Sequence, residues 1–325
     1  MVGRGSAAAR TLGLLRDSGV SGLINVASKP VAGFEQGHLS SLESLKGEEV
    51  DFVFDCSPAS QRVNHAGVLS ERGFRTIFEK PLAMTSEEGK LVLDRYAEAG
   101  VPVKVGYNLR SLRAFAFVRE VLDGFSIGGL RNAEISVGQY LPDWRPGRDY
   151  RSTVSAQQSL GGGVLLELSH EINYAIGLWG RVQKIEGETR HSGDLEIDAE
   201  DWAQGTMMFE SHPESAGVTL TLDFLRRIPE RWCRISGHEG EIVWDLLKNE
   251  VTVSTSSGAT LHRFDDSLDE TYRKDIGDML LSGSLPSDST HANADALHTL
   301  EVIDAWRLSS HSGRGVNVKR VSPRA

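Results

Sequence analysis

The sequence has little that would support a disulfide scaffold, a membrane span or a nucleic-acid-binding surface. Two of its 325 residues are cysteine, Cys56 and Cys233, so a structural disulfide is disfavoured and reduced thiols are expected. No apolar run approaches membrane-spanning length, and the amino terminus shows no charged-then-apolar signal segment. Lys and Arg number 35 against 45 Asp and Glu, and this formal net charge of -10 disfavours nucleic acid and anionic membranes as partners. These absences predict a soluble, cytoplasmic enzyme.

A metal-binding signature and internal repeats are also missing. Glu167 and His170 have the spacing of a ligand pair, but neither a His-Glu-x-x-His motif nor a cysteine cluster accompanies them, which disfavours metal catalysis. The sequence contains no internal repeat and no low-complexity segment. A length of 325 residues exceeds one ordinary hydrophobic core and fits two domains.

The first ten residues contain a dinucleotide-binding pattern. Gly3, Gly5 and Ala8 form G-x-G-x-x-A at the start of a helical pattern. Such glycines let a turn pass close to a pyrophosphate, whose charge the helix amino terminus receives. The strand that should precede the motif is reduced to residues 1–2, so we expect the true chain to start upstream. Cofactor contacts are expected from four residues of this segment: Gly3, Gly5, Ser6 and Ala7.

The second predicted strand, residues 22–29, ends without the acidic residue that usually binds the adenosine ribose. Ser28 and Lys29 stand in its place, and both are candidate cofactor contacts. A ribose site that lacks this carboxylate and has a cation beside it tolerates a 2′-phosphate, so the pattern favours NADP over NAD. The alternative for Lys29 is a surface residue in a turn.

Alternating strands and helices continue to residue 107 and predict a doubly wound parallel sheet. Strands are expected at 50–58, 74–78 and 101–107. Helices are expected at 61–72 and 85–99. The strand 74–78 ends in Glu79-Lys80-Pro81, and ligands bind at the carboxyl ends of strands in such sheets. The alternative for Glu79 and Lys80 is a solvated ion pair at an exposed strand end.

Beyond residue 107 the pattern changes to that of a largely antiparallel sheet with one face covered by helices. Strands are expected at 130–140, 182–188, 202–209, 218–224, 232–237, 241–245, 251–254 and 316–319, and helices at 112–122, 161–180, 271–282 and 291–309. A long polar and aromatic loop, 141–158, is more typical of substrate contact than of an idle connection. We therefore expect a dinucleotide-binding domain over 1–107 and a substrate-binding and oligomerisation domain over 108–325.

The predicted helix 161–180 carries a row of polar residues. Glu167, His170 and Asn173 follow one another at intervals of three, so adjacent members share a helical face. A carboxylate, an imidazole and an amide within an apolar helix are costly unless they have partners. A single histidine in such a helix is more often structural than catalytic, but three aligned polar groups favour a functional role.

These motifs together resemble the Gfo/Idh/MocA oxidoreductases, which include glucose–fructose oxidoreductase and inositol dehydrogenase. The resemblance spans nearly the whole chain and rests on G-x-G-x-x-A, Ser57-Pro58, Glu79-Lys80-Pro81-Leu82, Gly106-Tyr107-Asn108-Leu109-Arg110, the helix 161–173 and the closing helix 296–305. It implies an amino-terminal Rossmann domain followed by a domain with a large, mostly antiparallel sheet covered by helices on one face. It also implies a homodimer or homotetramer formed through that sheet.

The resemblance implies hydride transfer between NAD or NADP and a hydroxyl or keto carbon of a sugar, polyol or nucleotide-sugar. His170 is the expected general base, since the intrinsic pKa of an imidazole lies near neutrality. Lys80 would hold the substrate oxygen and stabilise developing negative charge, and Glu167 would orient His170. Further cofactor contacts are expected from Ser57, Pro58, Glu79, Lys80 and Asn108, and substrate contacts from Tyr107, Arg110, Trp144, Arg148 and Asn173.

The chain departs from the family pattern at three positions and leaves two other functions open. Asn173 replaces an aspartate of many relatives, Leu166 stands where they carry the carboxylate that partners the histidine, and Arg62 falls near a frequent histidine. The alternative functions are a non-catalytic NAD(P)-binding sensor and an NAD-dependent glycoside hydrolase. Retention of Lys80 and His170 argues against the sensor.

Overall fold

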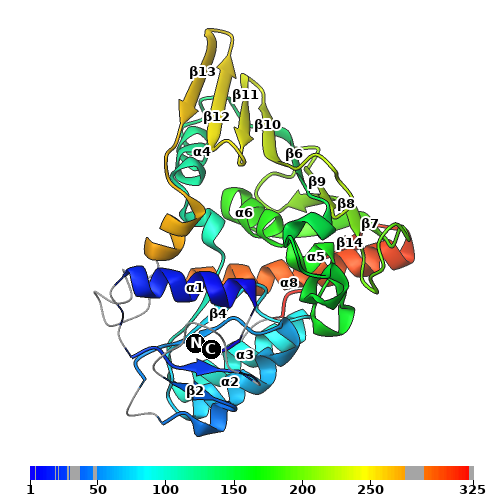
Figure 1. The fold of residues 1–325 in the computed structure, drawn as a ribbon. Helices are drawn as coiled ribbons and strands as arrows, with labels where there is room; N and C mark the ends of the chain where they lie inside the picture. The colour runs from blue at the N-terminus through cyan, green and yellow to red at the C-terminus, as the bar shows by residue number, and fades with distance from the viewer. Residues whose placement is uncertain are drawn as a thin grey trace. The chain divides into compact units, whose positions relative to one another are not determined.

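The computed structural model describes residues 1–3, 5–18, 20, 22–27, 29, 37–46, 50–274 and 289–321. The chain divides into two compact units (Figure 1). The first unit contains residues 1–108, 268–300 and 321–325, and the second contains 109–267 and 301–320. The long helix α8 (Ser289–Ser312) contributes residues to both units. The assignment of separate roles to 1–107 and 108–325 stays a prediction.

The first unit contains a parallel sheet in the Rossmann strand order, which confirms the predicted fold of this half. Its described strands are β1 (Asn25–Val26), β2 (His38–Leu39), β3 (Val53–Asp55), β4 (Thr76–Glu79) and β5 (Val103–Gly106). β1 pairs with β2, and β3 with β4 and then β5, all in parallel. Val2 forms parallel bridges to both Val26 and Asp55, so it takes the place of the first strand between β1 and β3.

Helices cover both faces of this sheet: α1 (Ser6–Asp17) lies on one side, and α2 (Arg62–Glu71) and α3 (Ser86–Ala99) lie on the other (Figure 1). The Thr85 hydroxyl accepts a hydrogen bond from the Glu88 amide and caps α3. Phe78 and Tyr96 are buried in an edge-to-face contact with ring centroids 5.8 Å apart. Single 3₁₀ turns occur at Leu42–Ser44, Ala59–Gln61 and Asn108–Ser111.

The second unit is built on a nine-stranded sheet in the order β13-β12-β11-β10-β6-β9-β8-β7-β14. All neighbouring strands are antiparallel except β6 and β9, so the mostly antiparallel sheet predicted from the sequence is confirmed. The strands are β6 (Leu130–Gly138), β7 (Val182–Arg190), β8 (Trp202–Phe209), β9 (Val218–Asp223), β10 (Glu230–Gly237), β11 (Gly240–Asp245), β12 (Glu250–Thr255), β13 (Gly258–Arg263) and β14 (Val316–Asn317).

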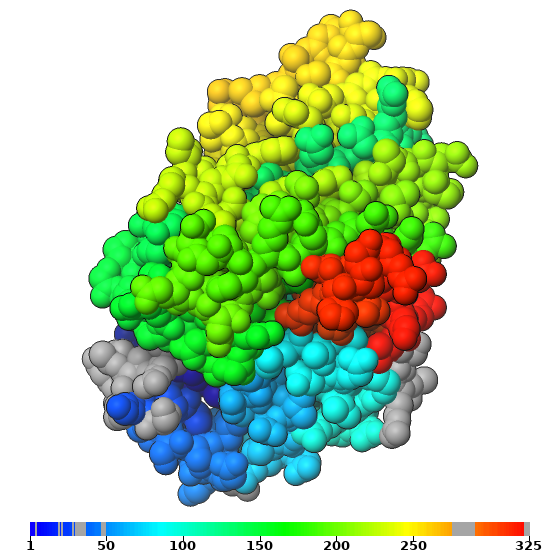
Figure 2. All heavy atoms as spheres, turned by 90° about the vertical axis from the view of Figure 1, so that its right-hand side faces the viewer, coloured from blue at the N-terminus to red at the C-terminus, as the bar shows by residue number. Residues whose placement is uncertain are grey.

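Three of the described helices pack on this sheet. α4 (Arg113–Asp123) contacts β11 and β12, and α5 (Val164–Glu167) contacts β8 and β9. Trp306 of α8 lies against Gly187 and Gly205, where an added Cβ at Gly205 would be 2.8 Å from the indole ring. The end of α8 and β14, red in Figure 2, lie against the green segment that contains β7, with which β14 pairs. Within the described ranges, no helix combines the length and the apolar character needed to cross a bilayer.

The structure corrects or completes the expected elements in four places. The helix predicted over 161–180 is two helices, α5 and α6 (His170–Trp179), because Leu168 leaves helical geometry (φ -101°, ψ 24°) and Ser169 begins a new turn. β13 was not expected, since its side chains are mostly exposed and lack alternation. The loop 141–158 contains 3₁₀ turns: Leu141–Trp144, Tyr150–Ser152, Val154–Ala156 and Gln158–Leu160. The predicted helix 271–282 is helical through residue 274, and its remainder lies outside the described residues.

Candidate functional site

The first glycine of the G-x-G-x-x-A motif lies against the carboxyl end of β3. Gly3 has φ +106°, and an added Cβ would lie 2.9 Å from the carbonyl carbon of Cys56. The amide of Gly3 donates to the Val26 carbonyl, and the amide of Cys56 donates to the Val2 carbonyl. A side chain at position 3 would therefore clash with the backbone leading to Ser57 and Pro58, which explains the glycine.

The second glycine leads into α1 with room around it. Gly5 is extended (φ -77°, ψ -173°), and no described atom lies within 4 Å of a Cβ built there. Among the described residues, no side chain caps α1, and its first turn (Ser6, Ala7, Ala8) carries no acidic residue. The amino terminus of a twelve-residue helix with a small, uncharged first turn suits a phosphate group. Gly3 and Gly5 together leave a cradle that fits the pyrophosphate of a dinucleotide.

Glu79, the residue before Lys80, is held through its main chain. Nη2 of Arg62 donates to the Glu79 carbonyl at 3.0 Å. Burial raises the pKa of Glu79, and the opposing charges of Lys80 and Arg62 offset only part of that effect. Lys80 itself is half-buried at the end of β4.

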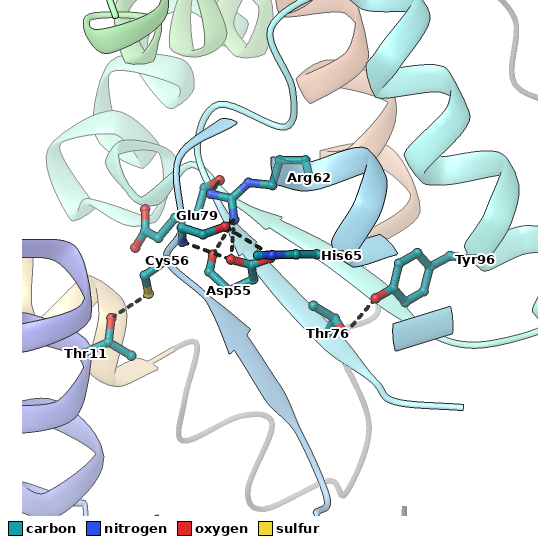
Figure 3. A network of polar contacts seen from close by, with 9 residues as sticks. Thr11, Asp55, Cys56, Arg62, His65, Thr76, Glu79 and Tyr96 are labelled. Atoms are coloured by element: carbon teal, nitrogen blue, oxygen red, sulfur yellow. Dashed lines mark hydrogen bonds and ion pairs between the residues drawn. The ribbon is translucent and has the colours of Figure 1, made fainter. Parts of the chain in front are cut away.

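A buried polar network joins the ends of β3 and β4 (Figure 3). Asp55 accepts from Arg62 Nη1 at 2.7 Å, from His65 Nδ1 at 2.7 Å and from the Ser57 amide at 2.9 Å. Burial opposes ionisation of Asp55, but Arg62 and His65 outweigh it and hold the pKa of Asp55 well below its usual value. The carboxylate is therefore ionised at neutral pH inside a closed set of donors.

The predicted base and its neighbours belong to the second unit. His170 is half-buried in the first turn of α6, and Asn173 follows one turn later, 1% exposed. Glu167 lies on α5, beyond the helix break, and its Oε2 accepts from the Ser155 hydroxyl at 2.7 Å. The expected single row of three is thus divided between two helices. Glu171, next to His170, accepts two hydrogen bonds from the Arg231 guanidinium, at 2.7 and 3.1 Å.

The five predicted substrate residues have different environments. Tyr107 is 9% exposed in the first unit, and Asn173 is buried. In the second unit, Arg110 lies over the Phe115 ring and beside Gly177 of α6, and the Trp144 indole donates to the Gln139 carbonyl at 3.1 Å. Arg148 is exposed. The structure thus gathers Arg110 against the helix of His170 and leaves Arg148 on the surface.

The predicted cofactor residues outside the segment 28–29 lie at the carboxyl edge of the parallel sheet. Asn108 is buried after β5 and donates to the Thr271 hydroxyl at 3.1 Å. Lys29 is exposed, and Ser28 lies outside the described residues. Sequence reasoning missed three partners that hold this edge: Asp55, His65 and Thr271. A carboxylate that ends an apolar run, as Asp55 does, is the signal that would have identified the first of them.

Comparison with known families matches both halves of the chain. Residues 4–107 match a model described as an oxidoreductase family with an NAD-binding Rossmann fold, and residues 115–243 match the GFO/IDH/MocA C-terminal domain. Curated relatives include an oxidoreductase P35 of Formosa agariphila, 22% identical over 212 residues, and a levoglucosan dehydrogenase of Pseudarthrobacter phenanthrenivorans, 26% identical over 155 residues. These alignments cover 65% and 47% of this chain, and 64% and 39% of the respective relatives. The chain thus aligns with less than two thirds of either relative's length.

Solved structures share the fold over almost the full chain. Levoglucosan dehydrogenase in complex with NADH and levoglucosan has a TM-score of 0.82 at 20% identity, with 98% of each chain covered. The WlbA dehydrogenase of Bordetella pertussis, in complex with NADH and UDP-GlcNAcA, has a TM-score of 0.81 at 18% identity, again with 98% of each chain covered. At these identities the likeness shows the fold alone.

Proposed function

Because the chain belongs to the Gfo/Idh/MocA family of NAD-binding oxidoreductases, we propose that it transfers a hydride between a nicotinamide cofactor and a sugar-like substrate. The reacting carbon would carry the hydroxyl or keto group of a sugar, polyol or nucleotide-sugar. The observation that carries this proposal is the edge of the parallel sheet, where the Gly3 turn, Ser57 and Glu79-Lys80 follow successive strand ends. Relatives that hold NADH with levoglucosan or UDP-GlcNAcA support the substrate class.

The dinucleotide would be held by the first unit, with the pyrophosphate at Gly3, Gly5 and the start of α1. When bound, the nicotinamide accepts or donates the hydride. The exposed Lys29 supports NADP over NAD, because a cation there tolerates a 2′-phosphate. We further propose that residues 1–107 bind the cofactor, and that 108–325 bind the substrate and associate into a dimer or tetramer through the nine-stranded sheet.

Three side chains would do the work of the protein in this reaction. His170 takes the hydroxyl proton during oxidation and returns it during reduction, a task suited to an imidazole near neutral pH. The Lys80 ammonium stabilises negative charge developing on the substrate oxygen. Glu167 orients His170, and the remaining proposed substrate contacts are Tyr107, Arg110, Trp144, Arg148 and Asn173.

Cofactor binding and turnover test the proposal in sequence. NADH and NADPH are titrated first, and a raised melting temperature identifies the better ligand by mass action. Sugars, polyols and nucleotide-sugars are then tested with that cofactor, and nicotinamide absorbance is measured in both reaction directions. Binding without any absorbance change supports a sensor, and release of a leaving group from glycosides without net NADH supports a hydrolase. Absence of binding to either cofactor contradicts the whole proposal.

Lys80→Ala tests the proposed role of the ammonium. Turnover is expected to fall about 100-fold, with cofactor affinity unchanged, since the stabilised charge develops in the transition state. Lys90→Ala is the matched control, because Lys90 pairs with Asp94 on α3 in the same unit. Equal turnover of the two variants would remove Lys80 from the mechanism.

His170→Asn tests the base. The rise of activity with pH near neutrality should flatten in this variant and persist in the exposed control His311→Asn. If activity still rises with pH near neutrality in His170→Asn, another group transfers the proton.

A further inference from the structure

Arg62 is a buried arginine whose contacts converge on two strand ends. It is 1% exposed and lies at the start of α2. Its Nη1 donates to the Asp55 carbonyl at 2.8 Å, in addition to the ion pair with the Asp55 carboxylate at 2.7 Å. Nη1 also lies 3.3 Å from the Ser57 hydroxyl, and Nη2 donates to the Glu79 carbonyl at 3.0 Å. One side chain therefore links the ends of β3 and β4 (Figure 3).

Stability alone is a weak reason to bury this guanidinium. Removing two charges from water costs several kcal/mol per ion, and buried ion pairs are often matched or exceeded by apolar residues of similar volume. The planar guanidinium has donors in a rigid fork, so it can fix two carbonyl oxygens at a set separation. At this position the fixed groups are the backbone of Asp55 and the backbone immediately before Lys80.

The segment before Lys80 is held from two directions. Nη2 of Arg62 donates to the Glu79 carbonyl at 3.0 Å. Phe78, 0% exposed, lies beneath the guanidinium with its ring centroid 5.4 Å from Cζ. Main-chain freedom at residue 79 is therefore small, and the direction in which Lys80 leaves the strand is fixed.

We infer that Arg62 is a positioning residue, which fixes the backbone that carries Lys80 and the adjacent Ser57 turn. The inference rests on the proposed function for its catalytic meaning, and on the contacts of Arg62 for its structural part. A displacement of about 1 Å in a reacting group can reduce turnover about 100-fold, so a displaced Lys80 should appear in kcat rather than in the KM of the sugar substrate.

Arg62→Lys is the central variant. A lysine ammonium preserves the charge opposite Asp55 but cannot span the carbonyls of Asp55 and Glu79 as the fork does. The expected result is a kcat lowered about tenfold, with the KM of the sugar substrate little changed. Hydrogen exchange, measured by mass spectrometry, should accelerate at the amides of residues 79, 80 and 82–84. Arg72→Lys is the matched control, because Arg72 also donates to carbonyls, those of Glu43 and Leu45, away from these strand ends.

A double variant separates positioning from stability. Asp55→Val/Arg62→Met removes both charges and should recover most of the stability that Arg62→Met alone loses. Positioning requires kcat to stay low in the double variant, whereas a purely structural role requires kcat to return with stability. Return of kcat, or wild-type exchange at residues 79, 80 and 82–84 in Arg62→Lys, overturns the inference. If the wild-type protein shows no turnover, the proposed function has failed, and the exchange comparison of Arg62→Lys with Arg72→Lys still decides whether Arg62 fixes this backbone.

Discussion

Each unit contains a buried arginine–carboxylate pair beside a proposed catalytic residue, and the two pairs are built differently. In the first unit, Arg62 and Asp55 are seven residues apart, with side chains 1% and 0% exposed. In the second, Arg231 of β10 and Glu171 of α6 are sixty residues apart, with side chains 20% and 0% exposed. The first pair joins neighbouring elements of one βα unit, and the second joins a helix to a distant strand.

The remaining donors show what each pair accomplishes. Arg62 also binds two backbone carbonyls, so its loss would alter the course of the main chain at the strand ends. Arg231 places two guanidinium nitrogens on the two oxygens of Glu171, so its loss would release the amino-terminal turn of α6 from the sheet. One pair therefore shapes a local backbone, while the other joins tertiary elements.

The largest expected effect is on stability, at the long-range pair. Arg231→Met leaves the Glu171 carboxylate buried without its counter-charge and should lower the free energy of unfolding by about 3–5 kcal/mol in urea denaturation. Glu171→Leu/Arg231→Met should recover most of this loss. Arg234→Met on the same strand is the control, because its pair with Glu241 is half-exposed and 3.7 Å long. Equal losses of unfolding free energy in Arg231→Met and Arg234→Met would contradict a stabilising role for the Arg231–Glu171 pair.

How well the sequence predicts a feature depends on how far apart in the chain the residues that form it lie. Alternation, turn residues and caps are local, so the parallel half, α2, α3 and most strands of the large sheet were predicted. The break at Leu168-Ser169 was not, because the apolar pattern continues through both α5 and α6. β13 was missed, because an edge strand with exposed side chains carries no burial pattern.

The same reasoning applies to the candidate site. Glycines, Ser57-Pro58 and Glu79-Lys80 are short motifs that one segment can display. Arg62 was visible as a departure from the family pattern, yet its function depends on the Glu79 carbonyl, which no sequence pattern reports. The partnership of Glu171 with Arg231 was invisible, since nothing local connects a helix residue to a strand sixty positions later.

An intermediate effect should appear as a pH dependence at the local pair. The pKa of Asp55 is depressed in the folded state, so its contribution to stability is fully present above the ordinary carboxyl value of about 3.9 and is lost as pH falls below it. Wild-type protein and Asp55→Asn should therefore differ by about 1.5–3 kcal/mol at neutral pH and converge in acid. Unfolding free energies measured from pH 7 downwards check this. A difference that stays constant with pH would show that Asp55 acts through shape rather than charge.

The smallest effect, and the sharpest test of the comparison, uses the cysteine beside each pair. Cys56 follows Asp55, and its sulfur lies 3.8 Å from the Thr11 hydroxyl; Cys233 lies two residues after Arg231 and is 0% exposed. Burial raises the pKa of both thiols, that of Cys56 to about 12, so little reactive thiolate exists in the folded protein. Both should react slowly with a thiol reagent, and Cys233 more slowly than Cys56.

Variants should release these thiols one at a time. Local opening governs the labelling of protected groups, so Arg62→Lys should accelerate labelling at Cys56 alone and Arg231→Met at Cys233 alone. Mass spectrometry of peptides labelled under native conditions distinguishes the two sites. If either variant accelerates both cysteines equally, opening is global and the two pairs are not separate devices. Selective release would instead show that each pair holds its own region, the end of β3 in one unit and the part of β10 around Arg231 in the other.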